Sequence, residues 1–130
     1  MKISCAAVVF QVENVERALA FYRDVLGFEQ EFHFGNYAGM HRGEFYVHLC
    51  GHQVWKRPLG GGAVFVFCDK VDAYHAQVAQ LGAKIEAAPA DQEYGMRDFV
   101  LRDPDGNVLT FGCELAKDEV AGEQSEADLP

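Results

Sequence analysis

The sequence predicts an α+β fold made of two similar modules, each with the element order strand–helix–strand–strand–strand (βαβββ). In each module an apolar extended run comes first, an amphipathic helix follows it, and three further extended runs follow the helix. The modules start about 55 residues apart, a spacing that indicates a duplicated half-domain rather than a solenoid repeat. We expect curved, mostly antiparallel sheets that enclose a cleft, with the helices outside.

The first module begins with the run CAAVVFQV and continues with a helix that starts near Val15. Asn14 is suited to cap this helix, and Gly27 is suited to the left-handed residue that commonly follows a helix end. The segments FEQEFHF, AGMHR and EFYVHLC then predict three strands, the first two of them separated by the turn residues Gly35 and Asn36.

The second module repeats this order from the run GAVFVF, with a helix that starts near Val71 and ends at Gly82. Asp69 is the expected N-cap of this helix. The segments AKIEAAP, DFVLRD and NVLTFGC predict the three strands that follow. The turn RDPDGN joins the last two strands, and Asp103 and Asp105 are explained as turn-forming residues.

These patterns place a single domain at residues 1–113, with modules at about 1–52 and 62–113 and a linker at 53–61 that is rich in turn residues. Residues 114–130 hold six acids and one lysine. We expect this acidic C-terminal tail to be helical or disordered, and to serve solubility.

The composition is that of a globular protein, and the formal net charge of −9 argues against a nucleic-acid partner. No apolar run approaches the ~18–20 residues of a membrane span, so we expect no membrane association. The opening MKISCAAVVF is better explained by a first strand than by a signal peptide, and we expect a cytoplasmic protein. The four cysteines lie in separate apolar runs, which predicts buried, reduced thiols rather than disulfides or a zinc site.

Strand alternation divides each sheet into a face covered by a helix and a face that lines the cleft. The positions expected under the helices are uniformly apolar, namely Phe45, Val47, Leu49, Leu109, Phe111 and Cys113. The opposite positions combine aromatic and polar side chains, the usual makeup of a small-molecule site. This second set comprises Ala7, Val9, Gln11, Tyr46, His48, Cys50, Ala63, Phe65, Phe67, Val108, Thr110 and Gly112.

Three stretches, VENVERALAFYRDVLGFE, AGMHRGEFYVHL and YGMRDFVLRDPDGNVLTF, resemble the glyoxalase, bleomycin-resistance and extradiol-dioxygenase superfamily, also called the vicinal oxygen chelate proteins. The resemblance covers residues 3–113. It implies a fold of paired βαβββ modules and a homodimer, often with the modules arranged across the interface.

Metal-dependent members of this superfamily hold one divalent cation with four side chains. Carried over by the resemblance, those positions are Ala7, His48, Ala63 (or its neighbour Gly62) and Thr110. Only His48 coordinates metals well, and such sites need about three or more protein ligands. We therefore expect no metal, no cofactor and no catalytic residue.

The remaining features resemble the non-catalytic bleomycin-resistance type, small acidic dimers that sequester a bulky cationic drug in grooves at the dimer interface. We expect this protein to sequester an amphipathic or cationic aromatic ligand without catalysis, an antibiotic being one candidate. Aromatic rings would stack on the ligand while polar side chains fix its orientation. The expected ligand-binding residues are Gln11, Tyr37, His48, Trp55, Phe65, Phe67, Tyr94 and Thr110.

Simpler interpretations remain open for several of these residues. His48 can be a satisfied core imidazole, and Phe65 and Phe67 can serve packing alone. Trp55 can act as a lid on the groove or pack on the junction of the modules.

Arg97 and Asp98 open a strand, where either can pair with a ligand, although a surface ion pair is the simpler explanation.

Two other function classes stay open. One is a divergent metal-dependent glyoxalase, thiol transferase or dioxygenase whose metal ligands lie elsewhere. The other is an interaction module that holds no small ligand.

Overall fold

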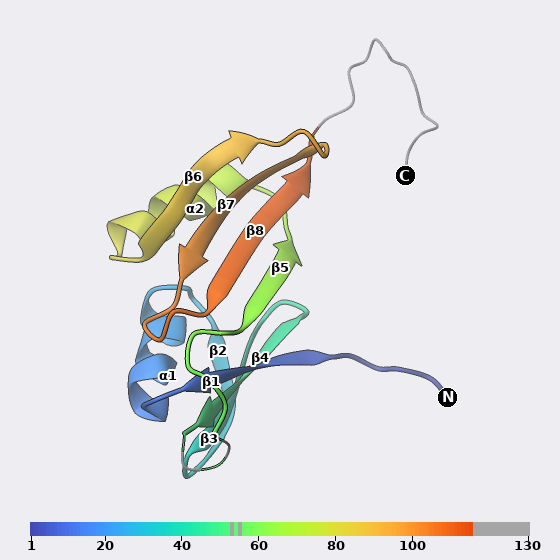
Figure 1. Ribbon diagram of the computed structural model, residues 1–130. Coiled ribbons are helices and arrows are strands. Elements are labelled where there is room, and N and C mark those ends of the chain that lie inside the picture. Colours follow the sequence, from blue (N-terminus) through green and yellow to red (C-terminus); the bar gives the residue numbers. More distant parts are fainter. Residues whose placement is uncertain (53, 55, 116–130) are drawn as a thin grey trace.

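The computed structural model describes residues 1–52, 54 and 56–115 and contains the two predicted βαβββ modules (Figure 1). The first module consists of β1 (Ala7–Val12), α1 (Val15–Asp24), β2 (Glu29–Phe34), β3 (Tyr37–Arg42) and β4 (Phe45–Gly51). The second consists of β5 (Ala63–Phe67), α2 (Val71–Gln80), β6 (Lys84–Asp91), β7 (Met96–Arg102) and β8 (Val108–Glu114). The predicted fold class and element order are confirmed.

Each module forms its own four-stranded sheet, in the orders β1-β4-β3-β2 and β5-β8-β7-β6. The first and last strands of a module pair in parallel, and the other neighbours pair antiparallel. The registers of the two modules correspond, since Val9 faces His48 on the neighbouring strand and Phe65 faces Thr110. The two sheets do not merge or close into a barrel.

The two helices begin differently. At the start of α1, Asn14 caps the helix as predicted, accepting a hydrogen bond from the backbone N–H of Arg17 at 2.8 Å. The predicted cap of α2 by Asp69 is wrong, because Lys70 occupies the N-cap position in a left-handed conformation with φ 54° and no side-chain cap. Past the helix ends, Gly27 and Gly82 have φ 80° and 101°, the conformation predicted for them.

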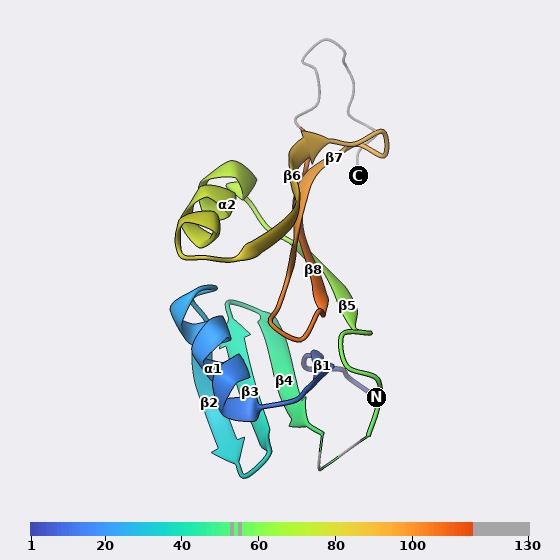
Figure 2. The same cartoon turned by 60° about the vertical axis from the view of Figure 1, so that its left-hand side comes forward.

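Helices α1 and α2 lie on the same side of the molecule, each against the sheet of its own module (Figure 2). The sheet faces that they cover form the core, so the predicted sorting of the faces is confirmed. The core strand residues include Phe10, Val12, Val47, Leu49, Phe99, Leu101, Leu109 and Phe111. The opposite faces of both sheets are left uncovered by helices.

The turn between β7 and β8 does more than reverse the chain, because it also docks onto the first module. Asp103 accepts hydrogen bonds at 2.9 Å from the backbone N–H groups of Asp105 and Asn107, which confirms its turn-forming role. It also accepts one from the Tyr22 hydroxyl of α1 at 2.9 Å. Both side chains are buried. Burial raises the pKa of Tyr22 well above its usual value, so the hydroxyl stays protonated, and burial also raises the pKa of Asp103.

Further contacts join the modules around this turn. The carboxylate of Asp105 accepts a hydrogen bond at 2.8 Å from the Arg17 guanidinium. The Asn107 amide donates to the carbonyl oxygen of Gln11 at 3.2 Å. On α2, the Tyr74 hydroxyl donates to the carbonyl oxygen of Leu26 at 2.6 Å. The two modules are therefore held together by specific polar contacts.

Other expectations have mixed outcomes. All four cysteines are free, but only Cys50 is fully buried, and Cys5 is exposed because it precedes β1. Within the described ranges, neither helix has the length and apolar character needed to cross a membrane. Trp55 and residues 116–130 lie outside the described residues, so the expected lid and acidic tail stay predictions.

Candidate functional site

The uncovered face of the first sheet carries a small aromatic cluster. The Tyr37 hydroxyl and His48 Nδ1 are hydrogen-bonded at 2.9 Å, and their ring centroids are 5.4 Å apart. Phe32 packs edge-on against His48 at 5.2 Å and stacks on Tyr37 at 6.2 Å. Burial raises the pKa of Tyr37. Tyr37 and His48, two of the expected ligand-binding residues, are thus in contact, and Gln11 lies on the same sheet.

The uncovered face of the second sheet carries two phenylalanines that are not part of a core. Phe65 is 38% exposed and Phe67 is 76% exposed, with ring centroids 5.0 Å apart. Both belong to β5, an edge strand of its sheet. Thr110 is the register partner of Phe65 on β8. Phe67 therefore does not serve the core of the described chain, whereas the Phe65 ring packs over Gly112.

Beside these rings lies a buried carboxylate. Asp98 is 3% exposed and accepts hydrogen bonds from the Tyr94 hydroxyl at 2.5 Å and from the Gln92 amide at 3.1 Å. The hydrogen bond to Asp98 is the main cause that raises the pKa of Tyr94. The Tyr94 side chain is otherwise exposed, at 64%.

The predicted surface ion pair is right for Arg97 only. Arg97 bridges Asp72 and Asp91, each at 2.9 Å. Asp98 is the next residue along β7, so its side chain points to the other face of the sheet. Among the described residues it forms no salt bridge.

Gly112 of β8 allows the Phe65 ring to lie close to Asp98. Across the sheet, Gly112 pairs with Phe67 on one side and with Asp98 on the other. A Cβ atom at this position would lie 2.9 Å from both the Phe65 ring and the Asp98 Cβ. Glycine thus allows Phe65 to lean toward Asp98.

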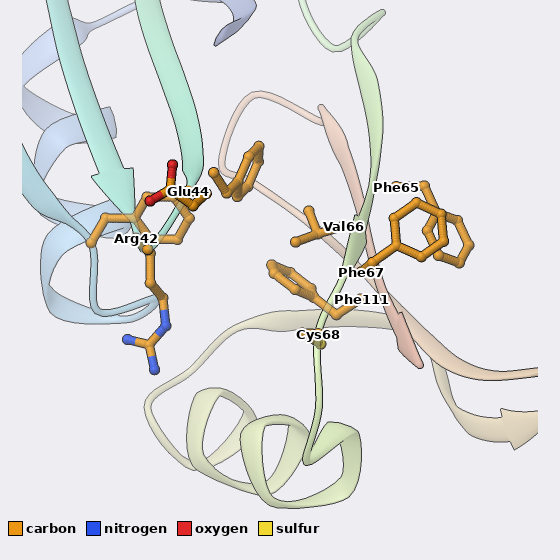
Figure 3. A pocket seen from close by; sticks show the side chains of 10 residues that line it. Arg42, Glu44, Phe65, Val66, Phe67, Cys68 and Phe111 are labelled. Carbon is orange, nitrogen blue, oxygen red and sulfur yellow. The ribbon is translucent and has the colours of Figure 1, made fainter. Parts of the chain in front are cut away.

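A cavity of about 660 Å³ lies at the edge of β5, between the two modules (Figure 3). Figure 3 shows the Phe65 and Phe67 rings on one side of β5 and Val66 on the other, toward Arg42 and Glu44 of the first module. Arg42 also lies over the Tyr74 ring at 5.1 Å. This volume is sufficient for a drug-sized molecule.

A smaller cavity of about 220 Å³ lies near β1 and contains Gln11, Val9 and Arg57. The expected ligand-binding residues are therefore distributed over two sheet faces. The lining of the large cavity includes Phe65 and Phe67, although their rings lie on the side of β5 away from Val66, Arg42 and Glu44 (Figure 3). Gln11 lines the small cavity, and neither cavity is lined by Tyr37, His48, Tyr94 or Thr110.

The side chains at the four positions that correspond to metal ligands do not fit a divalent cation. Ala7 and Ala63 offer no donor atom, and Thr110 offers only a hydroxyl. His48 has its Nδ1 bonded to Tyr37. In the described part of the chain, no three His, Cys, Asp or Glu side chains come together as a metal site.

A family model described as Glyoxalase/Bleomycin resistance protein/Dioxygenase superfamily matches residues 5–111. The chain belongs to this superfamily. None of the curated proteins matches the chain in sequence. The three similar solved structures described next are each less than 25% identical to it, so they support the fold alone.

Three of these structures show the range of the fold. A superfamily member from Sphaerobacter thermophilus has a TM-score of 0.76 at 22% identity, covering 87% of this chain and 98% of its own. A lactoylglutathione lyase from Agrobacterium tumefaciens has a TM-score of 0.73 at 22% identity, covering 87% and 95%. A bleomycin-binding protein from Streptomyces verticillus, complexed with copper(II)-bleomycin, has a TM-score of 0.71 at 24% identity, covering 90% and 99%.

Two features of this superfamily member's site could not be assigned from the sequence. For Asp98 the sequence favours a surface ion pair over a ligand contact, whereas the structure buries its side chain. Gly112 follows Phe111 in an apolar strand, and the sequence gives no sign that the Phe65 ring lies over it. The register across three strands would have found both, because it places Gly112 between Phe67 and Asp98.

Proposed function

We propose that the protein binds a small aromatic molecule, amphipathic or cationic, and sequesters it without changing it chemically. The observation that carries this proposal is the exposed pair of phenylalanine rings on the uncovered face of β5. Exposed large rings on an edge strand favour association with other molecules. A planar ligand would stack on them, with about 0.5–1.5 kcal/mol per ring pair beyond the burial of area.

The ligand-binding residues expected from the sequence form two surfaces in this proposal, one on each module. Phe65, Phe67 and Tyr94 provide stacking surfaces on the second module, and Thr110 offers a polar contact beside Phe65. Tyr37 and His48, with Gln11, form the corresponding surface on the first module, and Trp55 of the linker would cover the ligand.

We infer that the protein is a homodimer, because a single chain leaves one face of each sheet and the edge strands β1 and β5 uncovered. A second copy would bring the two surfaces opposite each other and cover the free edges β1 and β5. Several large apolar side chains support this inference by their exposure, among them Ile3 at 74%, Phe34 at 74% and Phe67 at 76%. Sedimentation velocity at micromolar concentration tests it, and a monomer would contradict it.

Sequestration, rather than turnover, is supported by the donor set at the four corresponding positions, which suits no divalent metal. Because a bleomycin-binding protein has the same fold, we propose an antibiotic as one ligand candidate and resistance as one role. We also propose a cytoplasmic location, which agrees with four free thiols.

The test measures binding, chemical change and metal content on the same preparation. Metal-free bleomycin and copper(II)-bleomycin are titrated by calorimetry, and the recovered compound is analysed by mass spectrometry. We expect at least one cationic aromatic compound of a wider panel to bind at micromolar Kd or better and to be recovered unchanged. Tyr37→Ala, Phe67→Ala and Tyr94→Ala should each weaken binding by about tenfold, with little change in folding.

Two results would overturn this function. The first is lactoylglutathione lyase activity that depends on an added divalent metal, with about one metal bound per chain. The second is that no compound of the panel binds, or that every compound that does bind keeps its affinity in all three variants.

A further inference from the structure

We infer that Asp98 is the anchor for a positively charged group on the ligand, held next to the stacking surface of Phe65 and Phe67. This inference rests on the proposed function and names the chemistry that the site selects: an aromatic ring system with a protonated amine about one or two bonds from the ring. Asp98 faces the same side of the second sheet as the two rings, and its carboxylate is buried.

The register of the sheet sets the spacing between ring and charge. Phe67, Gly112 and Asp98 lie in one row across β5, β8 and β7. Neighbouring strands are about 4.8 Å apart, so the backbones of Phe67 and Asp98 are separated by roughly 10 Å. Gly112 leaves the middle of this row without a side chain, and the Phe65 ring leans over it. A ligand ring on Phe65 and Phe67 would thus place a short aminoalkyl arm at the carboxylate.

Within the described residues, no cationic side chain pairs with Asp98. The groups that donate to it, the Tyr94 hydroxyl and the Gln92 amide, are both neutral. The nearest cation along the strand, Arg97, is held by Asp72 and Asp91 on the other face. An ionised carboxyl buried in this way gains from a cationic partner far more than an exposed one does.

The carboxylate also has acceptor capacity left for a ligand. Its two oxygens offer about four acceptor positions, and Tyr94 and Gln92 use one on each oxygen. Tyr94 lies on the turn between β6 and β7 next to Gly95, which has φ 88°, and most of its ring is exposed. The ring of Tyr94 can therefore cover a cation that binds to Asp98, which adds a cation–π contact.

A simpler role for Asp98 is to hold the β6–β7 turn through Tyr94 and Gln92. The two roles predict different results when the charge of the ligand is changed. A residue that only holds the turn would not affect how the affinity depends on ligand charge. Three probes share one fluorescent ring and differ in charge: 9-(aminomethyl)anthracene, 9-anthracenemethanol and 9-anthracenecarboxylate. Their affinities for the full chain are measured by fluorescence anisotropy at physiological salt.

We expect the amine to bind the wild-type protein at least about tenfold more tightly than the alcohol, and the carboxylate to bind most weakly. Asp98→Asn should bring the amine and the alcohol to within about twofold of each other while the alcohol keeps its affinity. The control Glu93→Gln removes the same charge from an exposed position nearby and should preserve the preference for the amine.

Each outcome bears on a different statement. Equal binding of all three probes, or a preference that survives in Asp98→Asn, overturns the role of Asp98 and leaves the proposed function standing. Failure of all three probes to bind the wild type overturns the chemistry inferred for the Asp98 site, and the proposed function then falls only if the wider panel also yields no ligand. If Asp98→Asn does not fold, Tyr94→Phe takes its place: it frees one carboxylate oxygen, and loss of the amine preference in that variant would overturn the inference.

Discussion

The contact between Tyr22 and Asp103 offers a sharp test of how the two modules are held together. Tyr22→Phe removes the hydroxyl that donates to the buried carboxylate at 2.9 Å and changes little else. The two residues are 0% and 3% exposed, so water cannot replace the lost donor. Hydrogen bonds to charged groups contribute about 1.5–3 kcal/mol, and we expect the free energy of unfolding to fall by that amount.

Tyr74→Phe is the matched control. Its hydroxyl also joins the modules, at 2.6 Å, but the acceptor is the neutral carbonyl oxygen of Leu26. Such a bond contributes about 0.5–1.5 kcal/mol, so this variant should be less destabilised than Tyr22→Phe. Urea denaturation of both variants and the wild type, followed by far-UV circular dichroism near pH 7, gives the three free energies of unfolding.

The effect of Tyr22→Phe should also depend on pH. Burial raises the pKa of Asp103 above its value in the unfolded chain, near 3.9. The folded protein therefore binds the proton of the Asp103 carboxyl more tightly than the unfolded chain does. The stability gained from this proton in acid is lost as the pH rises through the raised pKa of Asp103. Without the Tyr22 hydroxyl the pKa of Asp103 rises further, so the variant loses more stability between acidic and neutral pH. The gap between variant and wild type should thus narrow on acidification.

Two results would refute this reasoning. The first is a cost of Tyr22→Phe no larger than that of Tyr74→Phe. The second is a gap between Tyr22→Phe and wild type that stays constant from neutral to acidic pH, because the hydroxyl would then not be interacting with an ionised carboxylate.

Two glycine substitutions provide further predictions. Gly60→Ala should lower the free energy of unfolding by roughly 1–3 kcal/mol more than Gly43→Ala in thermal or urea denaturation, since both have positive φ but only Gly60 would place its Cβ against backbone, 2.6 Å from the Asp105 carbonyl oxygen. Equal costs would show that the clash is relieved. Gly112→Ala should weaken 9-(aminomethyl)anthracene binding about tenfold, because its Cβ would lie 2.9 Å from both the Phe65 ring and the Asp98 Cβ. Unchanged affinity would show that ligand binding does not depend on the position of the Phe65 ring over Gly112.

The sequence alone predicted the architecture well, because each module follows local rules. Asn14 caps α1, and Gly27 and Gly82 adopt positive φ, as the residue types indicate. The prediction for Asp69 failed because the chain reaches α2 through a left-handed Lys70, which no local preference indicates.

The candidate site was harder to predict because its parts meet only across strands. Phe65 and Phe67 were identified from the pattern, but alternation alone cannot distinguish a ring that packs from one that is exposed. A ligand contact of Asp98 was considered from the sequence, but its place in a row with Phe67 and Gly112 follows only from the register. Likewise, Asp103 was recognised as a turn former, while its bond to Tyr22 depends on how the modules dock.

The most direct test of the proposed function is an NMR titration of the ¹⁵N-labelled full chain with 9-(aminomethyl)anthracene. We expect the largest shifts of backbone amides in β5, β7 and β8 around Phe67, Asp98 and Gly112, saturating at one probe per site. The same titration of Asp98→Asn should need about tenfold more probe to reach saturation. Shifts that are confined to the surface of the helices, or no shifts at all, would contradict a cationic aromatic site on the second sheet.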